Sequence, residues 1–286
     1  MLNALLQGIL LGGLYALFAM GLAVIYGVMR LVNIAHGDLI VLAAYATLSV
    51  AALLHAGPFV AIPIVIAGFA VLGYVMQRGL LNRVLGADVL PPLVVTYGLS
   101  LVIQNVLLQA YSADARSLDV GGLATASLHV GGGIALGVMP LLVFGVALAV
   151  AAVLEYVFGH TRLGMAFRAT ADDRATVRLL GLDDGGVYAA AAAISFAVVA
   201  IAGLFMGIKT TFTPDLGPNF LLYAFEAVVI SGLGSFWGTF VGAILLGVAQ
   251  SIGFAINPGW GILAGHFVFL AVLLWRPTGL FARSAA

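Results

Sequence analysis

The sequence predicts an all-α membrane protein, a polytopic bundle of transmembrane helices. Hydrophobic residues make up 63% of the chain and charged residues only 8%, and the mean hydropathy is +1.20. A soluble domain carries about 25% charged residues, so this chain has too little polar surface to cover a globule in water. Its hydrophobic residues also fall in long runs, and a run of roughly 20 is enough to cross a bilayer.

We expect nine such segments, forming a single transmembrane domain over residues 1–286. The first is too long for the apolar core of a signal peptide and follows no basic residues, so we interpret it as a retained span. The seventh is too short for an upright crossing, because it reaches only about 21 Å at 1.5 Å per residue. It is either a half-helix packed against protein or a short helix continued by 233–236. The segments are 3–28, 39–56, 58–77, 89–111, 138–158, 187–208, 219–232, 238–256 and 261–276.

The distribution of Lys and Arg predicts the orientation, because loops on the cytoplasmic side carry an excess of them. If the N-terminus is outside and all nine segments cross, nine of the 11 basic residues lie inside. If 219–232 dips in and returns, the C-terminus changes side and the inside count falls to seven. We therefore expect nine crossings. The inside set is then Arg30, Arg78, Arg83, Arg162, Arg168, Arg174, Arg178, Arg276 and Arg283, with Arg116 and Lys209 outside.

Several function classes are disfavoured by composition and motifs. The formal net charge is zero, which argues against a nucleic-acid partner. The chain has no Cys, so it has no disulfide and no thiolate metal site. Its one lysine, Lys209, follows Ile208, so there is no P-loop for ATP hydrolysis. The histidines show no metal-ligand spacing and no nucleophile–base pair stands out, so we expect no enzyme activity, no metal and no cofactor bound by this chain.

The longest inside loop, 159–186, carries four arginines and a short predicted helix. Asp172 and Asp173 favour a helix start, where they complement the helix dipole, and Gly181 is a natural stop. Ala175 and Leu179 would share one face, and Val177 and Leu180 another. The loop is either a solvated connection or a docking site. The docking candidates are Arg168, Asp172, Asp173, Arg174, Ala175, Arg178, Leu179 and Gly181.

Two polar breaks interrupt the apolar runs, at 33–38 and 231–238. Each is either a simple turn or an unwound segment lining a cavity, since irregular backbone at membrane depth is tolerated only there. One break in each half suggests an inverted repeat. Glu226 either lines a path or snorkels to the interface, and Gln104 and Asn105 favour interhelical hydrogen bonds over a substrate site. The candidates for the substrate path are Asn33, His36, Asp38, Gln104, Asn105, Glu226, Gly234 and Trp237.

Four motifs in order, spread over nearly the whole chain, make it resemble the permeases of branched-chain amino acid ABC importers, specifically the shorter of the two permease types. The family commonly has Phe at Ile34, Glu at Asp172 and Gly at Ala282. The motifs are Gly12-Gly13-Leu14-Tyr15-Ala16-Leu17 with Asn33-Ile34-Ala35-His36-Gly37-Asp38, then Arg162-Leu163-Gly164 through Arg168-Ala169 to Leu179-Leu180-Gly181, then Gly232-Leu233-Gly234-Ser235 with Trp237-Gly238, and finally Arg276-Pro277-Thr278-Gly279-Leu280-Phe281.

The resemblance implies a location in the bacterial inner membrane, where the orientation expected from the basic residues makes the N-terminus periplasmic and the C-terminus cytoplasmic. It implies a second permease, two ATPase subunits that hydrolyse ATP, and a periplasmic substrate-binding protein. The ATPase would couple at the loop matching 162–181. The substrate would be a branched-chain or other hydrophobic amino acid, although relatives carry urea, short amides or aromatic acids, and the motifs do not choose among these. An ion-coupled secondary transporter is disfavoured because the spans hold few acidic residues, and a passive channel is the remaining rival.

Overall fold

The computed structural model describes residues 1–86, 88–129, 135–232 and 234–281, and almost all of its regular structure is helical. Two short strands, β1 (Ser127–His129) and β2 (Ala135–Gly137), pair antiparallel. The α-helices are α1 (Leu2–Met29), α2 (His36–Leu53), α3 (Pro58–Gly79), α4 (Leu90–Tyr111), α5 (Val138–His160), α6 (Arg162–Asp172), α7 (Arg174–Leu179), α8 (Asp184–Lys209), α9 (Gly217–Ser231), α10 (Phe236–Ile256) and α11 (Gly261–Trp275), with single 3₁₀ turns at η1 (Leu81–Arg83), η2 (Gly121–Leu123) and η3 (Pro258–Trp260).

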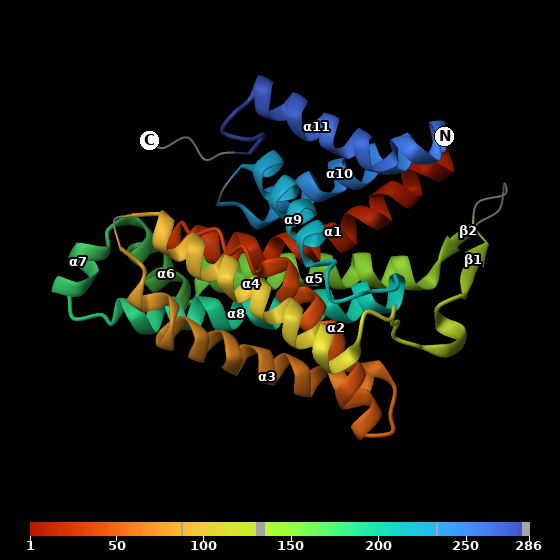
Figure 1. The fold of residues 1–286 in the computed structure, drawn as a ribbon. Coiled ribbons are helices and arrows are strands. Elements are labelled where there is room, and N and C mark those ends of the chain that lie inside the picture. The colour runs from red at the N-terminus through yellow and green to blue at the C-terminus, as the bar shows by residue number, and fades with distance from the viewer. Residues whose placement is uncertain (87, 130–134, 233, 282–286) are drawn as a thin grey trace.

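The predicted fold class, an all-α bundle of membrane helices, is confirmed. Within the described residues, eight helical segments are long and apolar enough to cross a membrane, and α9 is a shorter apolar helix. Helix α3 packs along α8, and Figure 1 shows α10 and α11 stacked on one flank of the bundle. Residues 159–186 were expected to form a loop with one short helix, but they contain two, α6 and α7. The additional helix is α6, which is stabilised at its start because Thr161 accepts a hydrogen bond from Gly164 N at 3.1 Å.

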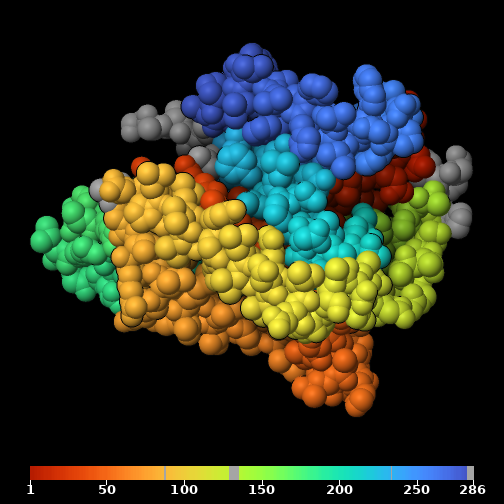
Figure 2. All heavy atoms as spheres, in the orientation of Figure 1, coloured from red at the N-terminus to blue at the C-terminus, as the bar shows by residue number. Residues whose placement is uncertain are grey.

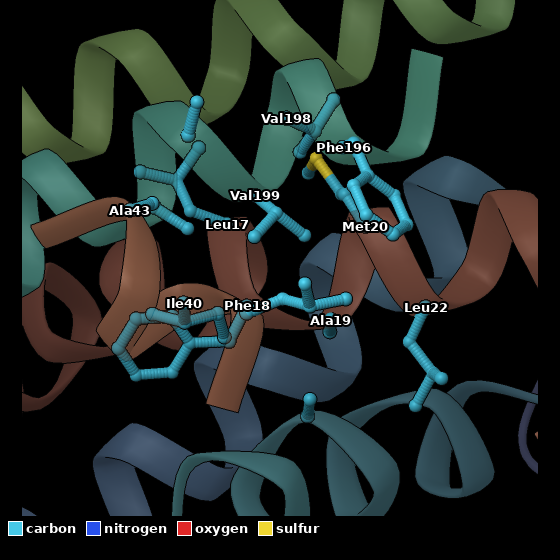
Figure 3. Packing of buried hydrophobic residues seen from close by; sticks show 14 of the residues in the cluster. Leu17, Phe18, Ala19, Met20, Leu22, Ile40, Ala43, Phe196, Val198 and Val199 are labelled. Carbon is cyan, nitrogen blue, oxygen red and sulfur yellow. The ribbon is translucent and has the colours of Figure 1, made fainter. Parts of the chain in front are cut away.

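Helix α1 lies at the centre of the bundle and is buried on almost every side. Its glycines allow close approach of other backbones: an ideal Cβ on Gly8 would lie 2.6 Å from Val248 Cα of α10. Such small-residue contacts are how helices associate tightly in lipid. Figure 3 shows the core formed around α1, where Leu17, Phe18 and Met20 meet side chains of α2 and α8, among them Ile40, Ala43, Val198 and Val199.

The bundle has two distinct ends. At one end, Gln7 of α1 donates to Ala135 O of β2, and Ser251 of α10 donates to Ala4 O. At the other end lie α6 and α7, and Leu280 N donates to Ile230 O at the end of α9, next to the turn that lines a cavity with α6. The start of α1 and residues 280–281 therefore lie at opposite ends, as nine crossings require.

Basic residues gather at the end formed by α6 and α7, as the predicted orientation requires. Of the ten basic residues that the structure describes, Arg116 and Lys209 lie at the β1–β2 end. Arg283 lies outside the described residues, as do two residues of the family motifs, Leu233 and Ala282. The eight basic residues at the α6–α7 end are Arg30, Arg78, Arg83, Arg162, Arg168, Arg174, Arg178 and Arg276.

Two unwound stretches, 30–35 and 210–216, lead into helices that begin inside the bundle. Helices α2 and α9 start side by side, because Gly37 and Gly217 contact each other directly. Helix α9 then runs from this point to the α6–α7 end. The short segment predicted at 219–232 therefore belongs to a passage through the bundle that consists of the unwound stretch 210–216 followed by α9. Only glycine fits here, since an ideal Cβ on Gly37 would lie 2.7 Å from Leu221 N.

The packing of α1–α3 matches that of α8–α10, which supports the predicted inverted repeat. Helix α1 packs on α10 and α9, and its counterpart α8 packs on α3 and α2. The two helices run in opposite directions, since α1 begins and α8 ends near the β1–β2 hairpin (Figure 1). However, the second break is misplaced in the sequence-based prediction. The counterpart of 33–38 is 210–217, whereas Ser231 and Phe236 are the last residue of α9 and the first of α10 at the α6–α7 end, where Gly232 and Gly234 have φ of 83° and 112°.

Candidate functional site

Helix α7 begins at Asp173 and ends before Gly181. The Asp173 carboxylate accepts from Ala175 N at 2.9 Å and Thr176 N at 3.1 Å. These bonds, together with one from the Thr176 hydroxyl, stabilise the charged form and lower the pKa of Asp173. Asp172 is instead the last residue of α6, so the expectation that it starts the helix is wrong. Gly181, with φ of 81°, ends the helix as predicted.

Asp184 fixes α7 against the start of α8. It accepts from Arg174 Nε at 2.5 Å, and from Arg178 Nε and Nη2 at 3.0 and 2.9 Å. The bonds and charge of Asp184 raise the pKa of Arg178, and the guanidinium of Arg174 lies 5.3 Å from the centre of the Tyr188 ring. Two docking candidates, Arg174 and Arg178, therefore position α7 within the chain. Sequence reasoning missed Asp184, although an acidic residue in the first turn of a helix was a usable signal.

The outward face of α7 is apolar. Leu179 and Leu180 are 88% and 75% exposed, and Ala175 is exposed beside them. Val177 is 3% exposed and points into the protein, so it does not share a face with Leu180 as predicted. The segment α6–α7, coloured green, protrudes from one end of the molecule in Figure 2. A protruding helix with an exposed leucine pair and arginines behind it has the form of a docking element.

Arg168 and Gly234 lie at the same end of the bundle as α7. Arg168 donates to Phe158 O, and both Arg168 and Gly234 line two neighbouring cavities between the end of α1 and the ends of α5 and α6. Gly234 was assigned to the substrate path, but the structure places it next to the docking candidates. Trp237 is 42% exposed and packs edge-on against Phe240, apart from the other path candidates.

The first break, 33–38, is tightly packed, and three of its side chains form hydrogen bonds. Asn33 Oδ1 accepts from Ala35 N at 3.1 Å, His36 Nε2 donates to Phe18 O at 2.8 Å, and Asp38 Oδ1 accepts from Gln104 Nε2 at 2.9 Å. Asn33, His36 and Asp38 are each at most 1% exposed. They hold the start of α2 against α1 and α4, and Gln104 forms the interhelical bond that was expected of it.

Asn105 does not join this cluster. Its side chain is exposed on α4 and donates to Leu101 O of its own helix at 2.7 Å, so the expected interhelical bond does not form.

A second polar cluster lies where α1, α9, α10 and α11 meet. Glu226, 1% exposed, accepts from His266 Nδ1 at 2.5 Å, and its Oε2 has no partner among the described residues. Close by, the Tyr15 hydroxyl donates to Gln250 Oε1 at 2.6 Å and its ring stacks on Tyr223. Only Glu226 was singled out from the sequence. His266 follows it by 40 positions, a spacing that carries no signal by itself.

The chain was compared with known proteins. The family model described as "Branched-chain amino acid transport system / permease component" matches residues 4–275. The high-affinity branched-chain amino acid transport system permease protein BraD of Pseudomonas aeruginosa is 29% identical, over 99% of this chain and 96% of the relative. LivH of Escherichia coli, a permease protein of the same description, is 27% identical over the same shares. LivM of Escherichia coli is 31% identical over 41% of this chain and 28% of its own length. No solved structure matches.

Proposed function

This chain belongs to the family of permease components of branched-chain amino acid transport systems, and we propose that it forms part of the path along which an ATP-driven importer carries branched-chain amino acids. The observation that carries the proposal is the family match over residues 4–275 on an all-α bundle of membrane helices. Urea, short amides or aromatic acids are the alternative substrates.

The proposal includes partner subunits. A sequence without a P-loop needs an energy source elsewhere, so ATP is hydrolysed by two separate ATPase subunits, and this chain binds no cofactor and catalyses no reaction itself. The partial similarity to LivM, described as a permease protein of the same transport system, supports a second, related permease beside this one. A periplasmic binding protein supplies the substrate.

The exposed face of α7 is the proposed contact with the ATPase. Asp184 and its two arginines fix the helix, and Leu179 is the apolar side chain offered to a groove on the partner. The gathering of basic residues at this end supports a cytoplasmic location for it. The N-terminus is then periplasmic and the C-terminus cytoplasmic, in the bacterial inner membrane.

Uptake by the complete transporter in liposomes tests the substrate. We expect labelled leucine to accumulate and to be displaced by excess isoleucine or valine, because one apolar path discriminates poorly between side chains that differ only in their branching or by one methylene. Urea and glutamate are the matched competitors that leave leucine uptake unchanged. Accumulation of urea in place of leucine would contradict the amino-acid assignment.

The path residues remain a prediction, tested in the same assay. We expect Glu226→Ala to lower uptake, because it removes a buried carboxyl group that holds His266 of α11. Asn33→Ala and His36→Ala are expected to lower it by loosening the start of α2. Asn105→Ala, at an exposed amide, is the control. Unchanged uptake in the first three variants would remove these residues from the path.

A further inference from the structure

A cavity of about 300 Å³ lies beside the start of α9, near the β1–β2 end of the bundle. Ligand pockets have volumes of about 300–1,000 Å³, so this one suits a small molecule. Figure 2 shows the region from outside: the cyan 210–231 segment is exposed between the blue helices α10 and α11 and the yellow α4. The walls are mainly apolar and include Leu14, Phe18, Phe220, Phe254 and Ile262.

Gln250 forms part of the inner wall of this cavity. The residue is 1% exposed, and its Oε1 accepts the Tyr15 hydroxyl at 2.6 Å. Its Nε2 is packed against α11, because an ideal Cβ on Gly265 would lie 2.9 Å from that atom. Tyr15 and Gln250, held together by their hydrogen bond, therefore form one closed wall of the cavity.

The polar side of the cavity favours an anion. Lys209, exposed at the end of α8, also lines it, and no carboxylate of the described residues lies within ion-pair distance of the ammonium. The first turn of α9 contributes Asn219 to the lining and directs the positive end of the helix dipole to the same place. A carboxylate is therefore matched by a lysine and a helix N-terminus, while an apolar side chain is matched by the aromatic and aliphatic walls.

We propose that this cavity binds the substrate itself, a small carboxylate with an apolar side chain, which for this transporter is a branched-chain amino acid. The proposal rests on the proposed function and adds a direct binding site within this chain, between release by the binding protein and passage along the path. The cavity lies at the end opposite to α7, on the side from which an importer receives its substrate. Binding there is weak, because a site on a transport path must also release its ligand.

A single reporter cysteine tests the site, since the chain has no Cys of its own. Asn219→Cys places a thiol at the cavity lining, and Thr125→Cys, exposed at the same end of the molecule, is the matched control. The complete transporter, with partner subunits free of cysteine, is embedded in lipid nanodiscs without ATP or binding protein. The rate of maleimide labelling is then measured with leucine, with leucinamide, which lacks the carboxylate, and with glycine, which lacks the apolar side chain.

We expect millimolar leucine to slow labelling of Asn219→Cys several-fold, with no effect of leucinamide or glycine and no effect on Thr125→Cys. Adding Lys209→Gln should remove the protection. If leucine leaves the rate unchanged while the same preparation takes up leucine with ATP and binding protein, the site is wrong and the proposed function stands. A thiol that is blocked in lipid and reactive in detergent, whatever the leucine concentration, would mean that a lipid occupies the cavity. If no branched-chain amino acid is taken up at all, the proposed function itself fails.

Discussion

Gly217→Ala is expected to prevent most of the protein from folding. The added Cβ would lie 2.8 Å from Asp38 Cα and would overlap the Asp38 carboxylate, which is held in place by Gln104. Neither the α2 backbone nor the buried carboxylate can move away cheaply. Overpacking of a rigid core costs about 1–3 kcal/mol, and more where the contact is with backbone. The measurement is the yield and thermal stability of the purified membrane protein.

Gly37→Ala should behave in the same way, because it removes the other half of the same contact. Gly68→Ala is the matched control: it lies within α3, it is exposed, and an added Cβ meets nothing within 4 Å. This control should leave stability unchanged or raise it slightly, since alanine favours helix more than glycine does. Normal yield and stability of Gly217→Ala would show that α2 and α9 do not start side by side.

Leu179→Asp is expected to lower ATP-driven uptake at least tenfold while the chain itself folds normally. Leu179 is 88% exposed, so the change breaks no packing within this chain. Burying a leucine in a partner groove contributes about 1.5–3 kcal/mol, and a carboxylate there would in addition be left unpaired. Both uptake and the ATPase activity stimulated by substrate and binding protein should fall, measured against the amount of purified complex.

Leu123→Asp, at an exposed leucine near the opposite end, is the control and should transport normally. Asp184→Asn gives a second comparison, because it weakens the two arginine contacts that position α7 without touching its outward face. Asp184→Asn should lower uptake and stimulated ATPase activity less than Leu179→Asp does. Full uptake and full stimulated ATPase activity in Leu179→Asp would remove α7 as the contact with the ATPase.

The spans were predictable because long apolar runs have few alternatives to membrane helices. The run that became α1 was recognised from end to end, and local signals were also reliable: Asp173 caps α7 and Gly181 ends it. Both signals act within a few residues, so the sequence contains all the information that they need.

The long-range arrangement was less predictable. The break at 210–216 was missed because apolar residues flank it, although Gly217 follows Gly37 by 180 positions at the equivalent place in the second half. Asp184 and His266 were missed as partners of Arg174 and Glu226, because their pairing depends on which helices pack together. The position of 231–238 in the fold was misjudged for the same reason. A glycine-rich interruption has the same sequence pattern whether it lies at the end of a bundle or inside it.

The most direct test of the central claim, that this chain is the membrane path of an ATP-driven importer and works only with partners, is leucine accumulation in liposomes. The purified chain alone is compared with the complete transporter, each with ATP or with an imposed ion gradient. We predict accumulation only for the complete transporter with ATP and binding protein. Accumulation by the chain alone under an ion gradient, without ATP, would contradict the claim and identify a secondary transporter.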